Sequence, residues 1–481
     1  MLRGNDSAAV IQSATSIVCV DLDGTLIAGD LLWESFVEFV KRHPSRALAS
    51  VAGLWRGKAH FKREIAREVR IDPSELSYRA EVLSALDESR RAGAALVLAT
   101  ASDEVYARAV AAHLGIFSDV IASDGRTNLS GRHKAAALVD RYGAGEFDYV
   151  GNDWADVPVW RVAGHATAVA ASPTLLRRVR ETRSIRELCA RRGVIPSLAK
   201  AMRPHQWVKN LLVFIPLLAA HTITDIDSWT AAALTFFVFC LCASAIYVFN
   251  DILDIRADRR HHRKRRRPFA AGDLGIPYGL TAATVLIAAG VTIAALGTSI
   301  EVVAIEIAYL AITSLYSLFL KRKPVVDVFT LTCLYVLRIV AGGVATGTPL
   351  SSWFLAFALF IFLSLAFVKR YAELITTQTE LAGRSYGPED LPWVHSFGTS
   401  SGYMAAVVLA LYINAPDVTA LYTRPQLLWI LCPLLLFWIT RLWFRAGRKI
   451  IHDDPVVETM KDPWSYAAAA TAAVTILLAA M

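Results

Sequence analysis

Long runs of uncharged, apolar residues in the carboxy-terminal part of this 481-residue chain limit its possible folds most strongly. Nine such runs recur after residue 206, and each is about long enough to cross a hydrocarbon core of about 30 Å. They cover residues 207–222, 229–249, 278–299, 302–320, 325–345, 353–368, 400–416, 426–441 and 464–481. Because 55% of the chain is hydrophobic and only 19% is charged, we expect an all-α integral membrane bundle of nine helices.

Basic residues are unevenly divided between the loops that would join nine spans. Loops 251–277, 321–323, 369–399 and 441–463 hold nineteen Lys and Arg, whereas the alternate loops hold only Arg424. By the positive-inside rule, the basic loops and the amino-terminal region lie in the cytoplasm, and an odd number of spans places the carboxy terminus outside the cell membrane. The first sixteen residues lack the apolar stretch of a secretory signal. The net charge of +8 therefore reflects topology, and no nucleic-acid partner is expected.

The amino-terminal part has a different composition. Short apolar segments (SIVCVDLDG, ALVLATAS, DYVGND, HATAVAAS) alternate with charged, helix-like segments, which is typical of a soluble α/β domain. We place this domain in residues 1–172 and the membrane domain in residues 201–481. Between them, the arginine-rich segment 173–200 predicts a helical linker that lies on anionic lipid headgroups.

Two carboxylates follow the first apolar segment of the α/β domain. In IVCVDLDGTL, Asp21 and Asp23 come where a strand ends and Gly24 turns the chain. At such a strand end, Asp21 can attack a phosphoryl group to form an aspartyl phosphate, and Asp23 can protonate the leaving oxygen. Both roles require Mg²⁺ to neutralise the phosphate charge. An Asx turn that closes a strand is the alternative interpretation.

Later segments supply a hydroxyl, a lysine and further acids, in that order. Thr100 ends the second strand, with Ser102 close by, Lys134 opens a helix, and DYVGNDWAD contains Asp153 and Asp156. Over about residues 15–172, this order resembles the haloacid-dehalogenase-like (HAD-like) phosphatases. The resemblance implies a Rossmann-like α/β fold with a small helical cap at about residues 31–90.

The same resemblance implies a role for each polar residue. Asp21 would be the nucleophile, Asp23 the acid and base, and Thr100 and Lys134 the phosphate anchors, with one Mg²⁺ bound by Asp21, Asp23, Asp153 and Asp156. The family's last motif often reads G-D-x-x-x-D, whereas Asn152 occupies its first acidic position here. Metal affinity is therefore reduced, or Asp153 substitutes. An inactive scaffold domain is the alternative.

A second acidic cluster lies at the end of the second apolar run, in the string IYVFNDILDIRADRRHHRKRRRP. It contains Asn250, Asp251, Asp254 and Asp258, and on a helix at 100° per residue the three aspartates fall within about 60° of one another. Clustered carboxylates at a membrane boundary suit one or two Mg²⁺ ions that join them to a diphosphate. The alternative is a solvated helix end whose acids pair with the neighbouring arginines.

Basic residues near these acids offer phosphate contacts. Lys264 and Arg267 lie in an unbroken basic run that ends at Pro268, and Lys321 precedes the fifth apolar run. A positive-inside anchor would look similar.

Within the fifth run, Asp327 and Arg338 are eleven residues apart and project only about 20° from each other on a helix. An intramembrane arginine is a functional candidate, and Asp327 is a charge partner too distant for a direct bond. The alternative is an arginine satisfied by backbone or polar neighbours.

The N-D-x-x-D-x-x-x-D string that starts at Asn250 resembles the UbiA superfamily of intramembrane prenyltransferases, which implies nine helices around a central cavity. The segments RPHQWVKNLLVF, L-K-x-x-x-x-x-D, Y-V-L-R and KRYAEL are most similar to its decaprenyl-phosphate phosphoribosyltransferase branch. His262 and Arg266 depart from that branch's H-P-x-K-x-N-R-P motif. Leu331 stands where the superfamily's second D-x-x-x-D motif would end, which agrees with a phosphoribosyl donor.

The resemblance implies transfer of 5-phosphoribose from phosphoribosyl diphosphate to a polyprenyl phosphate in the membrane. Mg²⁺ would be held by Asp251, Asp254 and Asp258, and the fused phosphatase would remove the 5-phosphate from the product. The substrate contacts would come from Asn250, Asp258, Lys264, Arg267, Lys321, Asp327 and Arg338. Two alternatives remain: a prenyltransferase that acts on an aromatic or other small acceptor, and a phosphatase anchored by a non-catalytic or transport domain.

Overall fold

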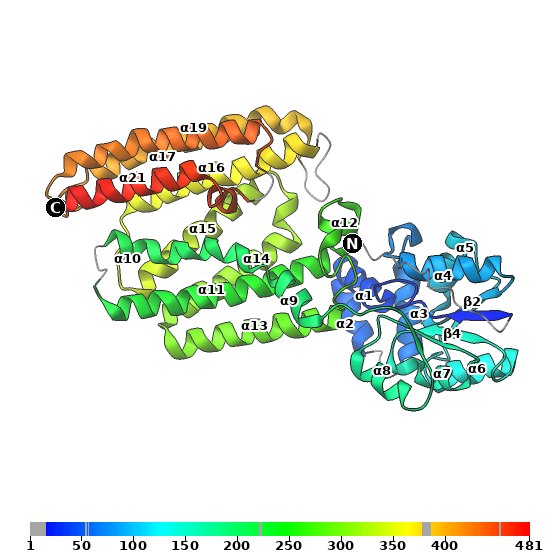
Figure 1. Ribbon diagram of the computed structural model, residues 1–481. Coiled ribbons are helices and arrows are strands. Elements are labelled where there is room, and N and C mark those ends of the chain that lie inside the picture. The colour runs from blue at the N-terminus through cyan, green and yellow to red at the C-terminus, as the bar shows by residue number, and fades with distance from the viewer. Residues whose placement is uncertain (1–15, 53–54, 56, 221–223, 378–385, 452–453) are drawn as a thin grey trace, which may run out of the picture. The chain divides into compact units, whose positions relative to one another are not determined.

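The computed structural model describes residues 16–52, 55, 57–220, 224–377, 386–451 and 454–481 (Figure 1). The chain divides into two compact units. We call the described part of residues 1–202, together with residues 248–282, the α/β unit, and residues 203–247 and 283–481 the helical unit. The end of helix α11 (Ile226–Leu253), helix α12 (Ile255–Arg260) and the start of helix α13 (Ile276–Gly297) therefore belong to the α/β unit.

A six-stranded sheet, parallel throughout, forms the centre of the α/β unit, in the order β3-β2-β1-β4-β5-β6. The strands are β1 (Ile17–Val20), β2 (Ala95–Asp103), β3 (Asp119–Ser123), β4 (Asp148–Gly151), β5 (Ala166–Val169) and β6 (Arg186–Cys189). β1 pairs with β2 on one side and β4 on the other, with Val18 opposite both Leu96 and Asp148. The strand order therefore reverses at β1, and open α/β sheets bind ligands at the carboxyl ends of such strands.

Helices cover both faces of this sheet. The alternation of buried side chains along β1 sends Val18 and Val20 to the face covered by α4 (Ala80–Arg91) and α5 (Glu104–Leu114). Cys19 points to the opposite face, against α6 (Arg132–Tyr142), α7 (Val157–Val162) and α8 (Pro173–Arg180). The predicted Rossmann-like α/β architecture of the amino-terminal part is confirmed.

The helical cap is smaller than the sequence indicates. Helices α1 (Leu31–Arg42), α2 (Pro44–Ala52) and α3 (Lys58–Glu68) enclose a separate apolar cluster around Phe39, Phe61 and Ile65. By contrast, α4 buries Val82 and Leu86 in the cluster beneath the sheet. The cap therefore consists of α1–α3, and the last part of residues 31–90 covers the sheet.

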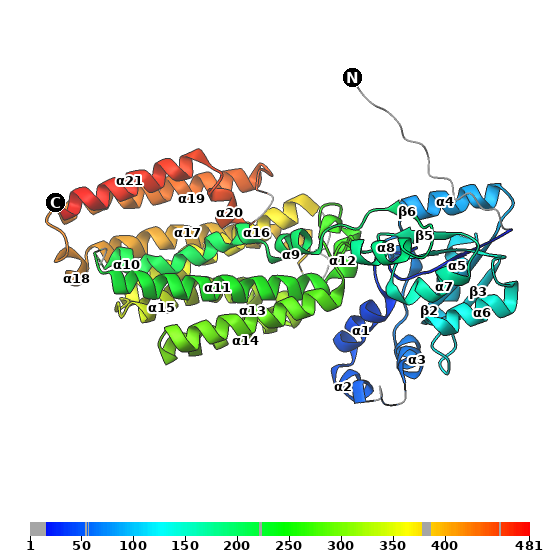
Figure 2. The same cartoon turned by 60° about the horizontal axis from the view of Figure 1, so that its bottom comes forward.

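The arginine-rich segment 173–200 does not form the expected linker helix. It contains α8, strand β6 at the sheet edge beside β5, and the start of α9 (Val194–Met202) (Figure 2). Without β6, strand β5 would be the edge of the sheet and would leave a row of backbone N–H and C=O groups unpaired. Residues 186–189 form hydrogen bonds with these groups as a sixth strand, so the segment is not one continuous helix.

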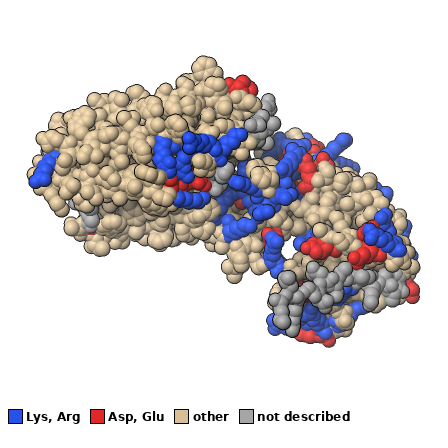
Figure 3. Space-filling model, turned by 45° about the horizontal axis from the view of Figure 1, so that its top comes forward, with Lys and Arg blue, Asp and Glu red and all other residues tan. Residues whose placement is uncertain are grey.

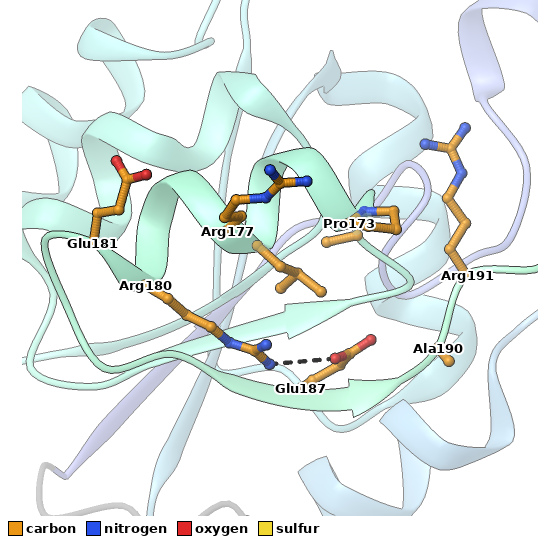
Figure 4. A pocket seen from close by; sticks show the side chains of 9 residues that line it. Pro173, Arg177, Arg180, Glu181, Glu187, Ala190 and Arg191 are labelled. Atoms are coloured by element: carbon orange, nitrogen blue, oxygen red, sulfur yellow. Dashed lines mark hydrogen bonds and ion pairs between the residues drawn. The ribbon is translucent and has the colours of Figure 1, made fainter.

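The α8 and β6 segment lines an open surface pocket of the α/β unit (Figure 4). Arg177, Arg180 and Arg191 contribute to its wall, and Arg180 forms an ion pair of 3.5 Å with Glu187. The pocket walls also include Ala171, Pro173, Leu176, Glu181 and Ala190. Three of the segment's arginines therefore line a pocket, and the segment's arginines do not follow one face of a continuous helix.

Eight described helices are long and apolar enough to cross a membrane, one fewer than expected. Beside α11 and α13, they are α14 (Ile300–Leu318), α15 (Val326–Ala345), α16 (Ser352–Thr377), α17 (Leu391–Ile413), α19 (Leu431–Gly447) and α21 (Pro463–Ala480). Shorter helices α18 (Pro416–Thr419) and α20 (Pro455–Thr459) lie between them in sequence. On the face shown in Figure 3, most of the helical unit's surface is uncharged, and its Lys and Arg gather mainly in one area.

The first expected span, 207–222, is not a continuous α-helix. The described part forms a 3₁₀ helix, η4 (Pro204–Phe214), followed by the short α10 (Ile215–Ala219). Pro216 explains the break, because it has no N–H to donate to the carbonyl of Leu212. Eleven residues at about 2.0 Å and five at about 1.5 Å still extend about 30 Å, so this mixed segment has the length of a span.

Candidate active sites

The first candidate site lies at the carboxyl edge of the sheet. Asp21 directly follows β1, and α6 directs Lys134 toward it, so that the Lys134 Nζ lies 2.9 Å from Asp21 Oδ1 and 3.3 Å from Asp156 Oδ1. Tyr149 also accepts a hydrogen bond from Lys134 and donates one to Asp156. All four side chains are buried. Asp21 and Asp156 raise the pKa of Lys134 above its ordinary value, although burial alone would lower it.

Asp23 lies two residues beyond Asp21, after the same strand, and has its own set of hydrogen-bond partners. Its carboxylate accepts hydrogen bonds from the Leu31 backbone N–H (2.7 Å) and the Ser102 hydroxyl (2.5 Å). Burial raises the pKa values of Asp21 and Asp23 to about 7 each, and the neighbouring charges of Asp156 and Asp30 respectively add to this effect. A carboxyl group that holds its proton near neutral pH is suited to general acid catalysis.

The expected hydroxyl anchor has a different neighbourhood. Thr100 is fully buried, and its Oγ1 accepts a hydrogen bond from the Ser102 backbone N–H at 3.0 Å. Ser102, two residues further on, is the hydroxyl that reaches Asp23. The pairing of β2 with β3 changes register between Ala99 and Asp103, the stretch that holds both hydroxyls.

The acids after β4 have separate structural roles. Asp153 is exposed, and its carboxylate accepts the Trp154 N–H at 2.7 Å as a helix cap. Asp156 is buried and accepts the backbone N–H groups of Asn152 and Asp153. Asn152 contacts the loop that follows β1, residues 21–25, because the Thr25 hydroxyl Oγ1 donates a hydrogen bond to Asn152 Oδ1 at 3.2 Å. A Cβ at Gly24, where φ is +73°, would lie 2.1 Å from the Asn152 side chain, so the loop requires glycine there.

Lys62 is a site residue that the sequence pattern did not indicate. It lies on cap helix α3 and donates to the carbonyl of Ala101 (2.6 Å) and to Asn128 Oδ1 (2.9 Å). Burial lowers its pKa, while Asp23 and Asp30 oppose that shift. In the sequence, Lys62 is one of several charged residues on an amphipathic helix, and this pattern predicts a lysine that faces solvent.

The donor set at this edge suits a divalent cation. The buried carboxylate of Asp21 and the half-buried one of Asp23 follow one strand, and the amide oxygen of Asn152 lies beside the same loop. Carboxylate, amide and carbonyl oxygens are the ligands that Mg²⁺ prefers. Among the described residues, no group of three or more His, Cys, Asp or Glu side chains is arranged to hold a metal ion. A cation at this edge would therefore need amide or carbonyl oxygens in addition to the carboxylates.

The second candidate site is also formed within the α/β unit, where α11 ends. The guanidinium of Arg267 lies 3.2 Å from Asp251 Oδ1 and 2.7 Å from Asp258 Oδ2, so both acids face the same cation. Both carboxylates are buried. α11 stops at Leu253, yet Asp254 and Asp258 keep the i to i−4 backbone hydrogen bonds across the break. Two of the three aspartates expected on one face, Asp251 and Asp258, therefore meet at one guanidinium. The alternative interpretation expected such a pairing with an arginine, but at a solvated helix end, whereas both carboxylates are buried.

This cluster has one further group suited to a cation. The side-chain oxygen Oδ1 of Asn250 is buried and receives no hydrogen bond from the described residues. An amide oxygen is, like a carboxylate oxygen, a ligand of the type that binds Mg²⁺. Lys264 opens the exposed 3₁₀ turn η5 (Lys264–Arg266), whereas Lys321 lies in another turn, η6 (Leu320–Arg322), of the helical unit.

In the helical unit, Asp327 forms an ion pair with a residue from another helix. Its Oδ2 lies 2.7 Å from Arg370 of α16, and both side chains are fully buried. Tyr386 donates to Asp327 Oδ1 at 2.8 Å, and Arg370 also contacts Glu373. Asp327 is therefore already neutralised by a guanidinium in the structure.

Arg338 is buried among polar and aromatic neighbours of the helical unit. It donates to Asn210 Oδ1 (2.8 Å), to the Tyr309 hydroxyl (3.0 Å) and to the carbonyl of Leu334, and its guanidinium lies 4.9 Å from the centre of the Tyr309 ring. These bonds match the alternative in which backbone and polar neighbours satisfy the arginine.

A further basic cluster was not predicted from the sequence. Asp454, the N-cap of α20, lies between Lys209 of η4 (2.7 Å) and Lys369 of α16 (3.1 Å), and Tyr335 donates to it from α15. Two lysines around one buried aspartate leave an excess positive charge that suits an anionic ligand. The segments RPHQWVKNLLVF and KRYAEL contain these lysines, but nothing local relates them to Asp454.

These features define a multi-pass membrane protein with an amino-terminal α/β domain that carries two carboxylates at the end of its first strand. Comparison with known families agrees: the model of the UbiA prenyltransferase family matches residues 211–456, and that of the haloacid dehalogenase-like hydrolases matches residues 18–161. The chain belongs to the UbiA prenyltransferase family and has an amino-terminal HAD-like hydrolase domain.

Relatives share this organisation wholly or in part. The "Uncharacterized protein y4nM" of Sinorhizobium fredii is 33% identical over 94% of this chain and 88% of its own length. A decaprenyl-phosphate phosphoribosyltransferase of Corynebacterium glutamicum is 37% identical over 44% of this chain and 67% of its own length. A solved UbiA homolog from Archaeoglobus fulgidus, bound to GPP and Mg²⁺, has 15% identity and a TM-score of 0.46, and covers 59% of this chain and all of its own.

Proposed function

We propose that the membrane domain transfers 5-phosphoribose from phosphoribosyl diphosphate to a polyprenyl phosphate, and that the HAD-like domain then removes the 5-phosphate. The observation that carries this proposal is the combination of one acidic cluster, at Asp251 and Asp258, with an Asp327 that is neutralised by Arg370. A prenyl diphosphate donor would call for a second acidic motif in place of that ion pair. The similarity to phosphoribosyltransferases supports the same donor.

In the transfer step, the bond between C1 of the ribose and the diphosphate breaks, and a phosphate oxygen of the lipid forms the new bond to C1. Asn250, Asp251, Asp254 and Asp258 would hold Mg²⁺, which neutralises the departing diphosphate. Arg267 contacts the same carboxylates and would bind the diphosphate oxygens. Nucleophile and leaving group are both ionised, so these residues contribute positioning and charge neutralisation.

Lys264 and Lys321 are further candidates for phosphate contacts. In the helical unit, the pair of lysines around Asp454 offers an excess positive charge to an anionic group of either substrate. Arg338 already bonds to Asn210 and Tyr309, so we assign it the role of organising the polar interior of the bundle.

In the phosphatase step, Asp21 attacks the phosphorus atom and the bond to the ribose O5 breaks. Asp23 donates a proton to that oxygen, then accepts one from the water that hydrolyses the aspartyl phosphate. The amino group of Lys134 and the hydroxyl groups at the end of β2, those of Thr100 and Ser102, would bind the phosphate oxygens. We assign the Mg²⁺ ligands to Asp21, Asp23 and Asn152, in place of Asp153, because Asn152 faces the loop and Asp153 caps Trp154.

We further propose that the soluble domain lies in the cytoplasm and the carboxy terminus outside. The mixed 3₁₀ and α segment at 204–219 would be the ninth crossing, since it extends about 30 Å. Cysteine labelling of intact cells tests this topology: we expect membrane-impermeant reagents to label a cysteine introduced beside Arg424 and not one introduced beside Lys449.

The experiment that tests the reaction uses membranes containing the full-length protein, polyprenyl phosphate and phosphoribosyl diphosphate labelled in the ribose. We expect the wild type to form labelled polyprenylphosphoryl ribose, Asp21→Asn to accumulate the 5-phosphorylated lipid, and Asp251→Ala to form neither. Consumption of a labelled prenyl diphosphate with an aromatic acceptor would overturn the assigned donor. If the Asp21→Asn variant releases inorganic phosphate from the lipid product as fast as the wild type does, the proposed role of the phosphatase domain is overturned.

A further inference from the structure

A buried ion pair joins the HAD cap to the segment that follows the acidic cluster of α11, and both lie in the α/β unit. Glu34 of α1 and Arg259 of α12 form two parallel hydrogen bonds of 2.7 Å each. Only 5% of the Glu34 side chain and 7% of the Arg259 side chain are exposed. A paired guanidinium and carboxylate in this geometry are far more constrained than an exposed pair.

The surroundings of this pair are closely packed. Arg259 Nε and the Ser77 hydroxyl both donate to the carbonyl of Ala270, at 3.1 and 2.8 Å. A Cβ at Gly29 would lie 2.0 Å from a carboxylate oxygen of Glu34, and a Cβ at Gly272 would lie 2.3 Å from the Cβ of Ala28. Two glycines therefore allow the soluble domain and residues 259–272 to approach each other closely.

Both candidate sites are adjacent to this contact. Arg259 directly follows Asp258, whose carboxylate pairs with Arg267. On the other side, the first turn of α1 contains Leu31, whose N–H binds Asp23, and Glu34. A single helical turn of the cap therefore contacts the acid of the phosphatase site and the residue that follows an acid of the transferase site.

We propose that Glu34 and Arg259 are positioning residues of the transferase: the soluble domain holds residues 254–273 in the conformation that presents Asp258 and Arg267 to the diphosphate of the donor. This inference rests on the proposed transferase function. It gives the fused domain a structural role in the membrane reaction, separate from its own chemistry. The fusion is then required for donor binding even when Asp21 is inactive.

The experiment measures transferase kinetics of the full-length Glu34→Gln and Arg259→Met variants in membranes. We expect the KM for phosphoribosyl diphosphate and the Mg²⁺ concentration at half-maximal rate to rise at least fivefold, with less than a twofold change in kcat. Arg259→Lys, which keeps the charge but loses the two-pronged geometry, should give intermediate values. A fall in kcat with unchanged KM and Mg²⁺ requirement would overturn the proposal.

Glu75→Gln is the matched control. Glu75 pairs with Arg260, the neighbour of Arg259, but the Arg260 side chain is 71% exposed, so this ion pair contributes little. We expect its KM to remain within twofold of the wild-type value. An effect equal to that of Glu34→Gln would show that any charge change in this region suffices, and would overturn the specific role of the buried pair.

A second readout does not require activity. Hydrogen–deuterium exchange of the full-length protein should become faster in residues 255–273 in Glu34→Gln, and remain unchanged there in Glu75→Gln. Hydrolysis of p-nitrophenyl phosphate, or circular dichroism if that activity is low, verifies that the soluble domain is folded. A wild-type protein that does not transfer phosphoribose would overturn the proposed function. Separately, unchanged hydrogen–deuterium exchange of residues 255–273 in Glu34→Gln would overturn this inference.

Discussion

At the scale of single residues, the buried charges of this protein are neutralised by partners that are distant in sequence. Asp454 binds Lys209, 245 positions away, and Asp21 binds Lys134, 113 positions away. Asp327 pairs with Arg370 on another helix. Removal of one partner from such a pair leaves the other charge buried and uncompensated, which costs more than the pair itself contributes.

The Asp454 cluster yields a prediction about stability. Although burial alone raises its pKa, Lys209 and Lys369 hold the pKa of Asp454 well below its ordinary value. The ionised carboxylate therefore stabilises the folded state above about pH 4, and this contribution is lost as the pH falls through the folded-state pKa. We expect Asp454→Asn to lower the free energy of unfolding at pH 7 by about 3–5 kcal/mol, because the buried Lys209 and the partly exposed Lys369 lose their counter-charge.

Thermal unfolding of the detergent-solubilised protein at several pH values checks this prediction. The difference in melting temperature between wild type and Asp454→Asn should be largest near pH 7 and should shrink toward pH 3. Asp225→Asn is a suitable control, since Asp225 is exposed and, among the described residues, its carboxylate bonds locally to Ser228 and Asp227. A difference that stays constant over this pH range would contradict the assigned charge interaction.

At the scale of elements, the 3₁₀ helix η4 lies directly against α15 through the backbone. A Cβ at Gly342 of α15 would lie only 2.0 Å from the carbonyl oxygen of Val213. Small residues that allow such close approach are typical of helix contacts in membranes. Gly342 therefore explains how a segment that is not a regular α-helix packs against α15.

Gly342→Ala tests this contact. The added methyl group must displace the Val213 backbone, so we expect the melting temperature to fall, corresponding to about 1–3 kcal/mol of overpacking. Gly297→Ala is the matched control, because its Cβ would meet only the flexible end of Leu234, at 3.2 Å. Alanine has the higher helix propensity, so the control should be neutral or slightly stabilising. Equal melting temperatures for the two variants would contradict the close backbone contact.

At the scale of the whole molecule, a UbiA-family membrane domain and a HAD-like hydrolase domain are joined in one chain, and the proposed function gives them one lipid in common. Covalent linkage raises the effective concentration of the second site for the product of the first. We therefore expect membranes that contain Asp21→Asn and Asp251→Ala proteins together to form dephosphorylated lipid more slowly than wild type, with more of the 5-phosphorylated intermediate. Time courses with labelled donor measure this difference. Equal time courses for mixture and wild type would show that linkage gives no kinetic advantage.

Local sequence was sufficient for several site residues and insufficient for others. Asp21 and Asp23 are recognisable because the strand, the acids and the glycine are contiguous. The bond of Ser102 to Asp23 and the contact of Lys62 with the carbonyl of Ala101 join residues that are 79 and 39 positions apart in sequence. Neither contact has a local signature, since both depend on how distant segments pack.

By itself, the sequence determined the two-part composition of this protein, the apolar lengths of its spans and the strand ends that carry its acids. These are local properties, set by side-chain chemistry and by the repeat of helix and strand. Tertiary structure alone decided that residues 186–189 complete the sheet, that Arg370 pairs with Asp327, and that Glu34 binds Arg259. Buried charges accept whichever partner the packed chain brings within hydrogen-bond distance, and sequence spacing does not encode that choice.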